Sequence, residues 1–240
     1  MDPMVHGWSA EQVKAAEAPH LEAGEPLMQR ASDGLAEAVR GLLRDSGRWP
    51  APVVLLVGSG SNGGDALFAG AALAADGCPV TVVPTGSWVH EAGLAAATGA
   101  GAVTDDPAAW ATPEGAGRRL QETGAAVLLD GLVGTGTSAD PALRGRARDV
   151  VEALLPSLSE PGAPAVVAVD VPSGIGPDDG SVPDPAVLPA TLTVTFGGHK
   201  AGLLLEPAAG LAGEVVLVDI GLLPDLAAVP PVISMPEPAP

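Results

Sequence analysis

A short apolar run that leads directly into a glycine-rich loop constrains this chain more than any other feature. Val53–Val57 is apolar at every position, as expected of a parallel strand covered on both faces. The loop that follows, 58–65, carries four glycines and ends in a carboxylate, and Ala66–Ala75 has the composition of a helix. A strand, a glycine-rich turn and a helix N-terminus form an anion site, because unpaired backbone N–H groups face the ligand. The sequence therefore predicts a binding site for a phosphorylated molecule.

The spacing of these glycines, G-x-G-x-x-G, contains the pattern of dinucleotide-binding loops, although glycines alone also suit any tight strand-to-helix turn. Two features argue against an ordinary dehydrogenase loop. Asn62 and Asp65 place side-chain oxygens where a pyrophosphate needs backbone donors. No acidic residue ends the next strand, Val80–Val83, as ribose recognition requires. We infer a loop that holds a phosphate and also offers oxygen ligands.

Apolar segments of strand length recur along the chain, and helical segments separate the earlier ones. Strands are expected at Val53–Val57, Val80–Val83, Ala125–Leu129, Ala165–Val169, Leu192–Phe196 and Val215–Val218. Helices are expected at Ser9–Ala18, Glu25–Leu43, Ala66–Ala75, Glu91–Thr98, Pro107–Thr123 and Ala147–Leu155. This alternation predicts an α/β fold with a mostly parallel sheet wrapped on both faces. The last two strands lack an intervening helix, which favours an antiparallel edge or a hairpin-like return there.

The length and net charge of the chain limit how many domains it can form and which partners it can bind. With 240 residues we expect one domain over 1–223, followed by a proline-rich tail, 224–240, that is a linker or a disordered end. The net charge of −18 makes nucleic acid a poor partner. No apolar stretch approaches the roughly 18 residues of a membrane span, which predicts no membrane partner. The single cysteine, Cys78, fits a reducing compartment, so we expect a cytoplasmic protein.

Polar residues appear where three of the predicted strands end. Asn62 lies in the glycine loop, Asp130 directly follows the third strand, and Asp170 and Ser173 follow the fourth. Parallel strands present their carboxyl ends at one edge of a sheet, where open α/β proteins bind ligands. One such aspartate is usually a turn residue, but two beside Asn62 and Ser173 favour a ligand site. The oxygens of Asn62, Asp130 and Ser173 can hold a monovalent or divalent cation that offsets phosphate charge.

Other chemistries are disfavoured by what the motifs lack. Ser173 has no G-x-S-x-G context, and the sequence has no G-x-x-x-x-G-K-[ST] loop of a P-loop kinase or ATPase. The histidines are scattered and the cysteine stands alone, which disfavours a zinc or iron centre. Asp170, at the mouth of a largely apolar crevice, is the best candidate for proton transfer.

Several segments together resemble the YjeF N-terminal-domain family, the NAD(P)H-hydrate epimerases. The matching segments are 27–31, 58–65, 130–136, 169–174, 193–203 and 213–221, in the family's order and over almost the whole chain. The resemblance implies a Rossmann-like three-layer α/β/α sandwich. It also implies interconversion of the R and S forms of hydrated NADH and NADPH (NADHX and NADPHX). That reaction supplies a dehydratase that accepts only the S form.

The resemblance also implies roles for individual residues. Asn62, Asp130 and Ser173 would be ligands of a potassium ion. The hydrated dinucleotide would contact Ser61, Asn62, Gly63, Gly64, Asp65, Gly134, Thr135, Gly136, Thr137, Ser138, Ala139, Asp140 and Asp170. The stereocentre is a hemiaminal carbon, so proton transfer at its hydroxyl or at the ring nitrogen opens and recloses the ring. Asp170 is the expected acid/base, and Lys200 is expected either to orient it or to meet a phosphate.

Two departures from the family pattern stand out. Ser61 replaces the first of two loop asparagines, and Ala66 replaces the glycine after the loop's aspartate. Neither removes the expected ion or proton chemistry. The resemblance further implies a homodimer, for which the apolar first helix is a candidate interface. It also implies a functional link to an ADP/ATP-dependent NAD(P)H-hydrate dehydratase, once fused to such a chain.

Two other functions remain open at the level of sequence. A non-catalytic nucleotide-binding or scaffold module of the same fold is the first, since some members of the family act in that way. A conventional NAD-dependent dehydrogenase is the second, and the missing ribose-binding acid counts against it.

Overall fold

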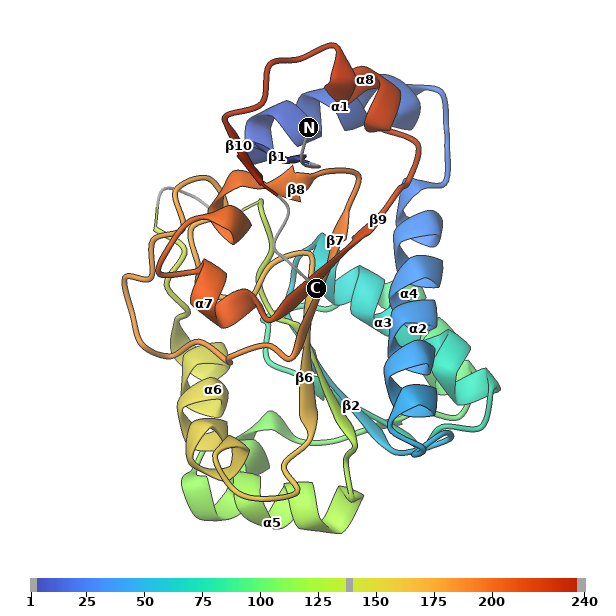
Figure 1. Cartoon of the computed structure of the whole chain (residues 1–240). Coiled ribbons are helices and arrows are strands. Elements are labelled where there is room, and N and C mark those ends of the chain that lie inside the picture. Colours follow the sequence, from blue (N-terminus) through green and yellow to red (C-terminus); the bar gives the residue numbers. More distant parts are fainter. Residues whose placement is uncertain (1–3, 137–139, 237–240) are drawn as a thin grey trace.

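A parallel sheet forms the centre of the computed structural model, which describes residues 4–136 and 140–236 (Figure 1). Its seven strands follow the order β4-β3-β2-β5-β6-β7-β9. They are β2 (Val53–Val57), β3 (Val80–Pro84), β4 (Val103–Thr104), β5 (Val127–Gly131), β6 (Ala165–Val169), β7 (Leu192–Phe196) and β9 (Glu214–Val218). Every neighbouring pair in this sheet is parallel.

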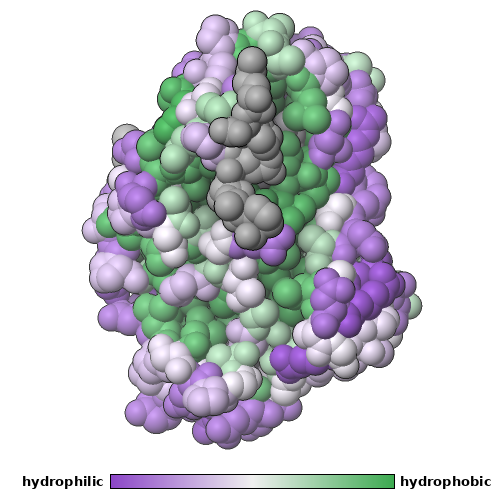
Figure 2. Space-filling model, viewed as in Figure 1, coloured by the Kyte–Doolittle hydropathy of each residue, from purple (hydrophilic) through white to green (hydrophobic). Residues whose placement is uncertain are grey.

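Helices cover both faces of the sheet. One face carries α2 (Leu27–Asp45), α3 (Ser61–Ala75) and α4 (Glu91–Gly99); the other carries η1 (Pro107–Trp110), α5 (Pro113–Thr123) and α6 (Gly145–Leu158). Alternate strand residues serve the two layers, because Val53 and Leu55 join the first core while Val54 and Leu56 join the second. The outer surface of α2 forms a hydrophilic strip at the right of Figure 2. The predicted three-layer α/β/α sandwich is confirmed.

A second, smaller sheet joins the two ends of the described chain. In it β1 (Met4–Trp8) lies between β10 (Ile233–Pro236), to which it is antiparallel, and β8 (His199–Lys200), to which it is parallel. Helices α1 (Ala10–Glu22) and α8 (Leu223–Ala227) contact each other beside this sheet (Figure 1). The predicted capping box at the start of α1 is present, formed by Ser9 and Gln12.

The structure corrects two predictions about the last third of the chain. The final strands of the main sheet, β7 and β9, are parallel and not antiparallel, because the chain between them passes through β8, η2 (Ala201–Leu204) and α7 (Ala209–Ala212) before it returns. Residues 224–236 are not an unstructured tail, since they form most of α8 and all of β10. Proline is tolerated in the first turn of a helix and on an edge strand, which are the positions it takes here.

Two helix boundaries also differ from the prediction. The helix expected over Pro107–Thr123 is divided into η1 and α5, where Thr112 caps a new helix that opens on Pro113. Helix α3 begins at Ser61, so it includes the last five residues of the glycine-rich loop, 61–65. In the described part of the chain, no helix is both long and apolar enough to cross a membrane.

The order of strands locates the ligand crevice. From β2 the chain moves to one side through β3 and β4, then returns to β5 on the other side of β2. Ligands of open α/β sheets bind at such a reversal, beyond the carboxyl ends of the strands. The loops after β2 and β5 touch there: a Cβ on Gly58 would lie 1.7 Å from the Leu132 carbonyl oxygen. Glycine at this position is what allows the two loops to meet.

Candidate active site

A cavity of about 1370 Å³ lies at the carboxyl ends of β2 and β5, beside α1. The loops after β2, β3 and β5 line it, together with residues of α1, the end of β6, and Lys200 of β8. Pockets for small molecules usually measure about 300–1,000 Å³, so this one has room for a dinucleotide.

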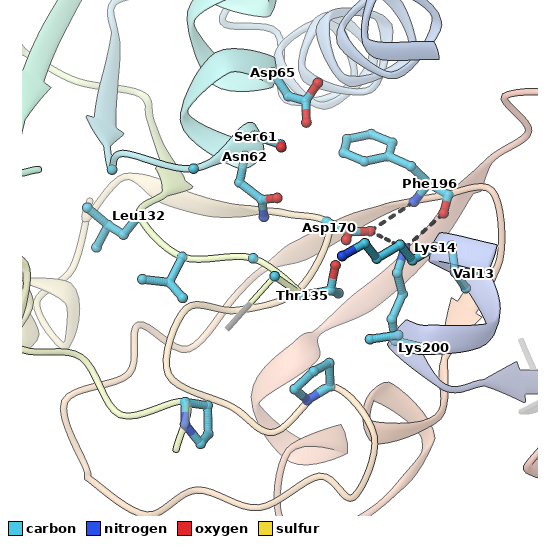
Figure 3. Close-up of a pocket in the computed structure, with 18 of the residues that line it drawn as sticks. Val13, Lys14, Ser61, Asn62, Asp65, Leu132, Thr135, Asp170, Phe196 and Lys200 are labelled. Atoms are coloured by element: carbon cyan, nitrogen blue, oxygen red, sulfur yellow. Dashed lines mark hydrogen bonds and ion pairs between the residues drawn. The ribbon is translucent and has the colours of Figure 1, made fainter. Parts of the chain in front are cut away.

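The start of α3 forms one wall of the cavity, and Figure 3 shows Asn62 and Asp65 projecting from it. Gly60 occupies the N-cap position and supplies no side-chain hydrogen bond to the first turn. Backbone N–H groups in a first turn without a side-chain cap are available to an anion, and the helix dipole favours negative charge there. A helix N-terminus that opens into the cavity therefore lies where the sequence predicts a phosphate site.

Asp170 lies at the floor of this cavity in an uncommon backbone conformation. Its φ of +69° makes it the only non-glycine residue with positive φ in the described ranges. Its carboxylate oxygen Oδ1 accepts hydrogen bonds from Thr195 Oγ1 and the Phe196 amide, both at 3.1 Å, and from Lys200 Nζ. Within the described residues no donor meets Oδ2. A left-handed backbone costs about 1–2 kcal/mol for an ordinary residue, so surrounding contacts must hold Asp170 in place.

Lys200 is buried beneath Asp170 and holds that carboxylate. Its side chain is 2% exposed, and it donates to Asp170 Oδ1, to the Phe196 carbonyl at 2.8 Å and to Thr195 Oγ1 at 3.3 Å. An ammonium group has three protons, and these three acceptors use them all. Of the two predicted roles for Lys200, the geometry suits orientation of Asp170 and leaves no proton for a phosphate.

The three predicted cation ligands come together beside the cavity. Asp130 is fully buried and accepts hydrogen bonds from the Ser173 hydroxyl at 2.6 Å and the Ser173 amide at 2.8 Å. The amide nitrogen of Asn62 donates to the Val169 carbonyl at 2.5 Å. A Cβ on Gly134 would lie 2.1 Å from Asn62 Oδ1, so the loop backbone packs directly on that oxygen.

The donor chemistry of this cluster fits a cation. Burial raises the pKa of Asp130, and its hydrogen-bond partners in the described chain, Ser173 and Leu132, carry no charge. A buried carboxylate with neutral partners lacks the positive charge that normally compensates it. The set contains one carboxylate and otherwise neutral oxygens, which are the ligands of a hard cation. Within 4–136 and 140–236, no three His, Cys, Asp or Glu side chains form a group able to hold a metal ion.

The predicted dinucleotide contacts divide into three groups. The cavity lining includes Ser61, Asn62, Asp65, Gly134, Thr135, Gly136 and Asp170. Three others do not line it: Gly63 and Gly64 are buried within the first turn of α3, and Asp140 is exposed and pairs with Arg144 at 2.5 Å. Thr137, Ser138 and Ala139 lie outside the described residues.

Sequence reasoning missed the contribution of α1. Lys14 and Glu17 both line the cavity, and Figure 3 shows the Lys14 ammonium extending toward the side that holds Asp170 and Thr135. Burial raises the pKa of Glu17, with Lys200 opposing the shift. The one available signal was that Lys14 and Lys200 are the only lysines in a chain with 29 acidic residues.

Comparison with known proteins identifies the family of this chain. The model of the family described as YjeF-related protein N-terminus matches residues 24–202. The chain belongs to this family. A Clavibacter michiganensis protein named NAD(P)H-hydrate epimerase is 50% identical over 95% of this chain and 94% of its own length. A protein of the same name from Microbacterium testaceum is 44% identical over 96% of this chain and 84% of its own length.

Longer relatives and a solved structure complete the comparison. A Mycobacterium tuberculosis protein named bifunctional NAD(P)H-hydrate repair enzyme Nnr is 40% identical over 91% of this chain, which matches 42% of that longer protein. The crystal structure of yeast ynu0 (YNL200c) has a TM-score of 0.64 at 19% identity, over 82% of this chain and 83% of the yeast chain. That likeness shows the shared fold. The family match ends at residue 202 and begins at residue 24, so α1 with Lys14 and Glu17 precedes it.

Proposed function

We propose that this protein is an isomerase that interconverts the R and S forms of hydrated NADH and NADPH. The observation that carries the proposal is the Asp170 carboxylate at the floor of a dinucleotide-sized cavity, with three donors on one oxygen and none on the other in the described residues. Relatives that match nearly the whole chain at 44–50% identity are named NAD(P)H-hydrate epimerase, which supports the same activity here.

Asp170 acts on the hydroxyl of the hemiaminal carbon. Three hydrogen bonds to Oδ1, one from an ammonium, stabilise the ionised carboxylate and fix its direction. Oδ2 then accepts the hydroxyl proton as the ring opens and returns it as the ring closes on the other face. Lys200 is a positioning residue in this proposal, because its protons are committed to protein acceptors. A positioned base of this kind contributes about 100- to 10,000-fold to a rate.

Positive charge for the diphosphate comes from the walls of the cavity. A chain with a net charge of −18 repels an anionic substrate at long range, so the attraction must be local. The first turn of α3 and the Lys14 ammonium are the sources that line the cavity. We place the diphosphate between them.

The cation of this site is proposed to be potassium, held by Asn62, Asp130 and Ser173. When bound, it supplies the charge that compensates buried Asp130 and stiffens the loop after β5. Exchange of potassium for choline at constant ionic strength is expected to lower the Tm by about 2–4 °C for each 1 kcal/mol of binding free energy that is lost. The Asp130→Asn variant removes the carboxylate but keeps the shape, so its Tm should be equal in the two salts. A wild-type Tm that is also equal in both would contradict the site, whatever the activity.

The activity itself is tested with NADHX enriched in the S form, incubated in potassium buffer and resolved by chiral HPLC. Spontaneous epimerisation sets the baseline. The R form is expected to appear faster in proportion to protein concentration. A baseline rate from folded protein that still binds NADP⁺ would leave the non-catalytic nucleotide-binding module as the function.

The names of the longer relatives suggest which reaction uses the product. We propose that the product passes to an ADP/ATP-dependent NAD(P)H-hydrate dehydratase, which the bifunctional repair enzymes are expected to carry in the same chain. The homodimer and the cytoplasmic location stay predictions.

A further inference from the structure

The geometry points to Asp65 as the second proton-transfer group of this site, the acid that protonates the ring nitrogen while Asp170 acts on the hydroxyl. This inference rests on the proposed function and extends it. Asp65 directly follows the first turn of α3, and Figure 3 shows its carboxyl facing the cavity on the side opposite the floor that holds Asp170.

Burial without a partner distinguishes this carboxyl. Asp65 is 6% exposed, and its Oδ1 is a buried polar atom with no hydrogen-bond partner among the described residues. The Ser32 hydroxyl donates its single proton to the Met28 carbonyl at 2.7 Å, and its interaction with Asp65 lowers the pKa of that carboxyl less than burial raises it. An oxygen left unsatisfied beside a cavity is available to a ligand.

The charges around the cavity do not balance if every carboxyl is ionised. Glu17 of α1, Asp65 of α3 and Asp170 after β6 face one buried cation, Lys200 of β8. Lys200 is hydrogen-bonded to Asp170, so Glu17 and Asp65 have no buried cation of their own. Lys14, which also lines the cavity, is exposed, and its charge lowers the pKa of Glu17. Each ionised carboxyl in a shared site disfavours the ionisation of its neighbours, which favours a retained proton on one of them. Asp65 is the better buried of the two, with Glu17 only part-buried.

The ionisation of Asp65 follows this arrangement. Burial raises its pKa to about 8, the charges of Asp170 and Glu17 add to the shift, and Ser32 and Lys200 oppose it. At neutral pH Asp65 therefore carries a proton that it can donate. Asp170, with three donors on one oxygen and the other oxygen open, suits the role of proton acceptor, so the two carboxyls can divide the acid and base roles.

The protons balance through the reaction. Asp170 takes the hydroxyl proton, the carbon–oxygen bond becomes a carbonyl, and the bond from that carbon to the ring nitrogen breaks. The electron pair of the broken bond goes to the nitrogen, which takes the proton of Asp65. Rotation about the adjacent carbon–carbon bond presents the other face of the aldehyde. The nitrogen then attacks that face and returns its proton to Asp65, while the new hydroxyl regains its proton from Asp170.

The test is the pH dependence of kcat in the wild type, Asp65→Asn and Glu17→Gln. Wild-type kcat should fall as pH rises through about 8, because Asp65 then loses its proton. Asp65→Asn should lower kcat at pH 7 by about 100- to 1,000-fold and remove that alkaline limb. Glu17→Gln removes a neighbouring negative charge, which lowers the pKa of Asp65 and moves the limb to lower pH. An Asp65→Asn variant that keeps more than a tenth of wild-type kcat with the same alkaline limb overturns the proposal.

A stability measurement separates this proposal from the proposed function. Because the pKa of Asp65 is raised in the folded state from an ordinary 3.8, wild-type stability falls as pH rises from there to about 8. Asparagine does not titrate, so the Tm of Asp65→Asn relative to the wild type should increase over that range and then stay constant. A folded wild type without activity overturns the epimerase and, with it, the role of Asp65, while the Tm difference still reports its proton. If Asp65→Asn does not fold, an unmoved alkaline limb in Glu17→Gln overturns the proposal.

Discussion

Asp170→Asn should lower kcat for NAD(P)HX epimerisation by about 100- to 10,000-fold, because asparagine keeps the shape of the side chain but cannot accept the hydroxyl proton. The same change leaves Lys200, 2% exposed, without its carboxylate. Removal of one partner of a buried ion pair typically costs about 3–5 kcal/mol, so the variant should also be less stable. Chiral HPLC gives the rate, and urea unfolding gives the free energy of unfolding.

A double variant separates the two effects. Asp170→Asn combined with Lys200→Met removes both charges, so it should recover much of the lost stability. It should not recover activity, since the base is still absent. Recovery of the rate together with stability would mean that Asp170 supports the fold and that the proton acceptor lies elsewhere.

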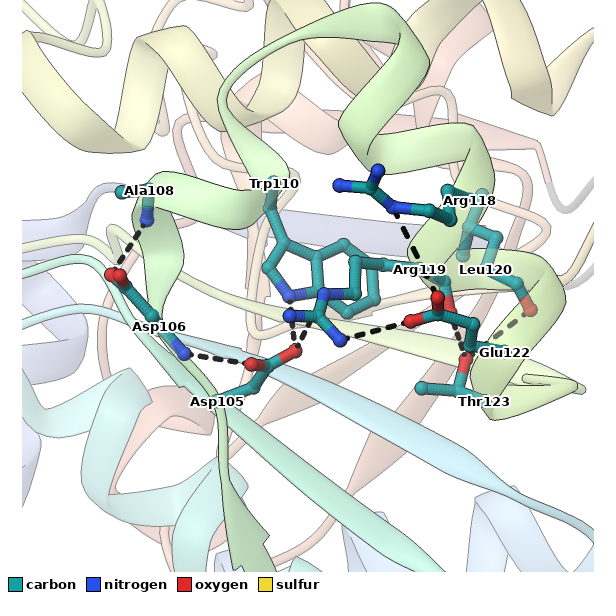
Figure 4. Close-up of polar contacts among 9 residues, drawn as sticks. All are labelled: Asp105, Asp106, Ala108, Trp110, Arg118, Arg119, Leu120, Glu122 and Thr123. Atoms are coloured by element: carbon teal, nitrogen blue, oxygen red, sulfur yellow. Dashed lines mark hydrogen bonds and ion pairs between the residues drawn. The ribbon is translucent and has the colours of Figure 1, made fainter.

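A loss of stability as large as that of Asp170→Asn is expected from Trp110→Ala. Figure 4 shows the indole of Trp110, which is 0% exposed, donating from Nε1 to Asp105 Oδ2 at 2.9 Å. Arg119 Nε lies 3.4 Å from the same oxygen, so the indole fixes a carboxylate that also ties α5 to the loop after β4. Replacement of a buried tryptophan by alanine costs about 3–5 kcal/mol in the free energy of unfolding.

The chain offers a matched control for this change. Trp88 is 59% exposed, and Trp88→Ala should alter the free energy of unfolding by no more than about 0.5 kcal/mol. The loss in the free energy of unfolding for Trp110→Phe should lie between those of Trp110→Ala and Trp88→Ala. Trp110 belongs to the core of the α5 and α6 layer and does not line the cavity, so KM at a temperature where Trp110→Ala is folded should equal that of the wild type. Equal losses in the free energy of unfolding for Trp110→Ala and Trp88→Ala would contradict the burial of Trp110 in this core.

The main sheet could be predicted because its strands carry a strong local signal. Val53–Val57 and Ala165–Val169 are apolar on consecutive positions, and a glycine loop or an aspartate marks where each ends. The contact between Asp130 and Ser173 was predictable for the same reason, since carboxyl ends of neighbouring parallel strands meet at one edge.

The small sheet and the α1 contribution could not be predicted in this way. Strand β8 has two residues, too few to show a period, and β1 and β10 pair across 228 positions of sequence at His6 and Ser234. Whether Glu17 faces Asp65 or solvent depends on how this sheet sets α1 against the cavity. The pairing of β1 with β8 and β10 therefore determines the orientation of α1, and with it which charges surround Asp65.

The position of β1 between β8 and β10 also determines the order in which the two sheets can form during synthesis. The backbone of Lys200 pairs with that of Trp8, and the opposite side of the same strand pairs with residues 233–236. Synthesis proceeds from the N-terminus, so β1 can pair with β10 only after residues 233–236 have left the ribosome. All strands of the main sheet precede β10 in the sequence, so the main sheet can form before the small sheet is complete. The strand that pairs with the backbone of Lys200 therefore gains its second neighbour later than the main sheet gains its last strand.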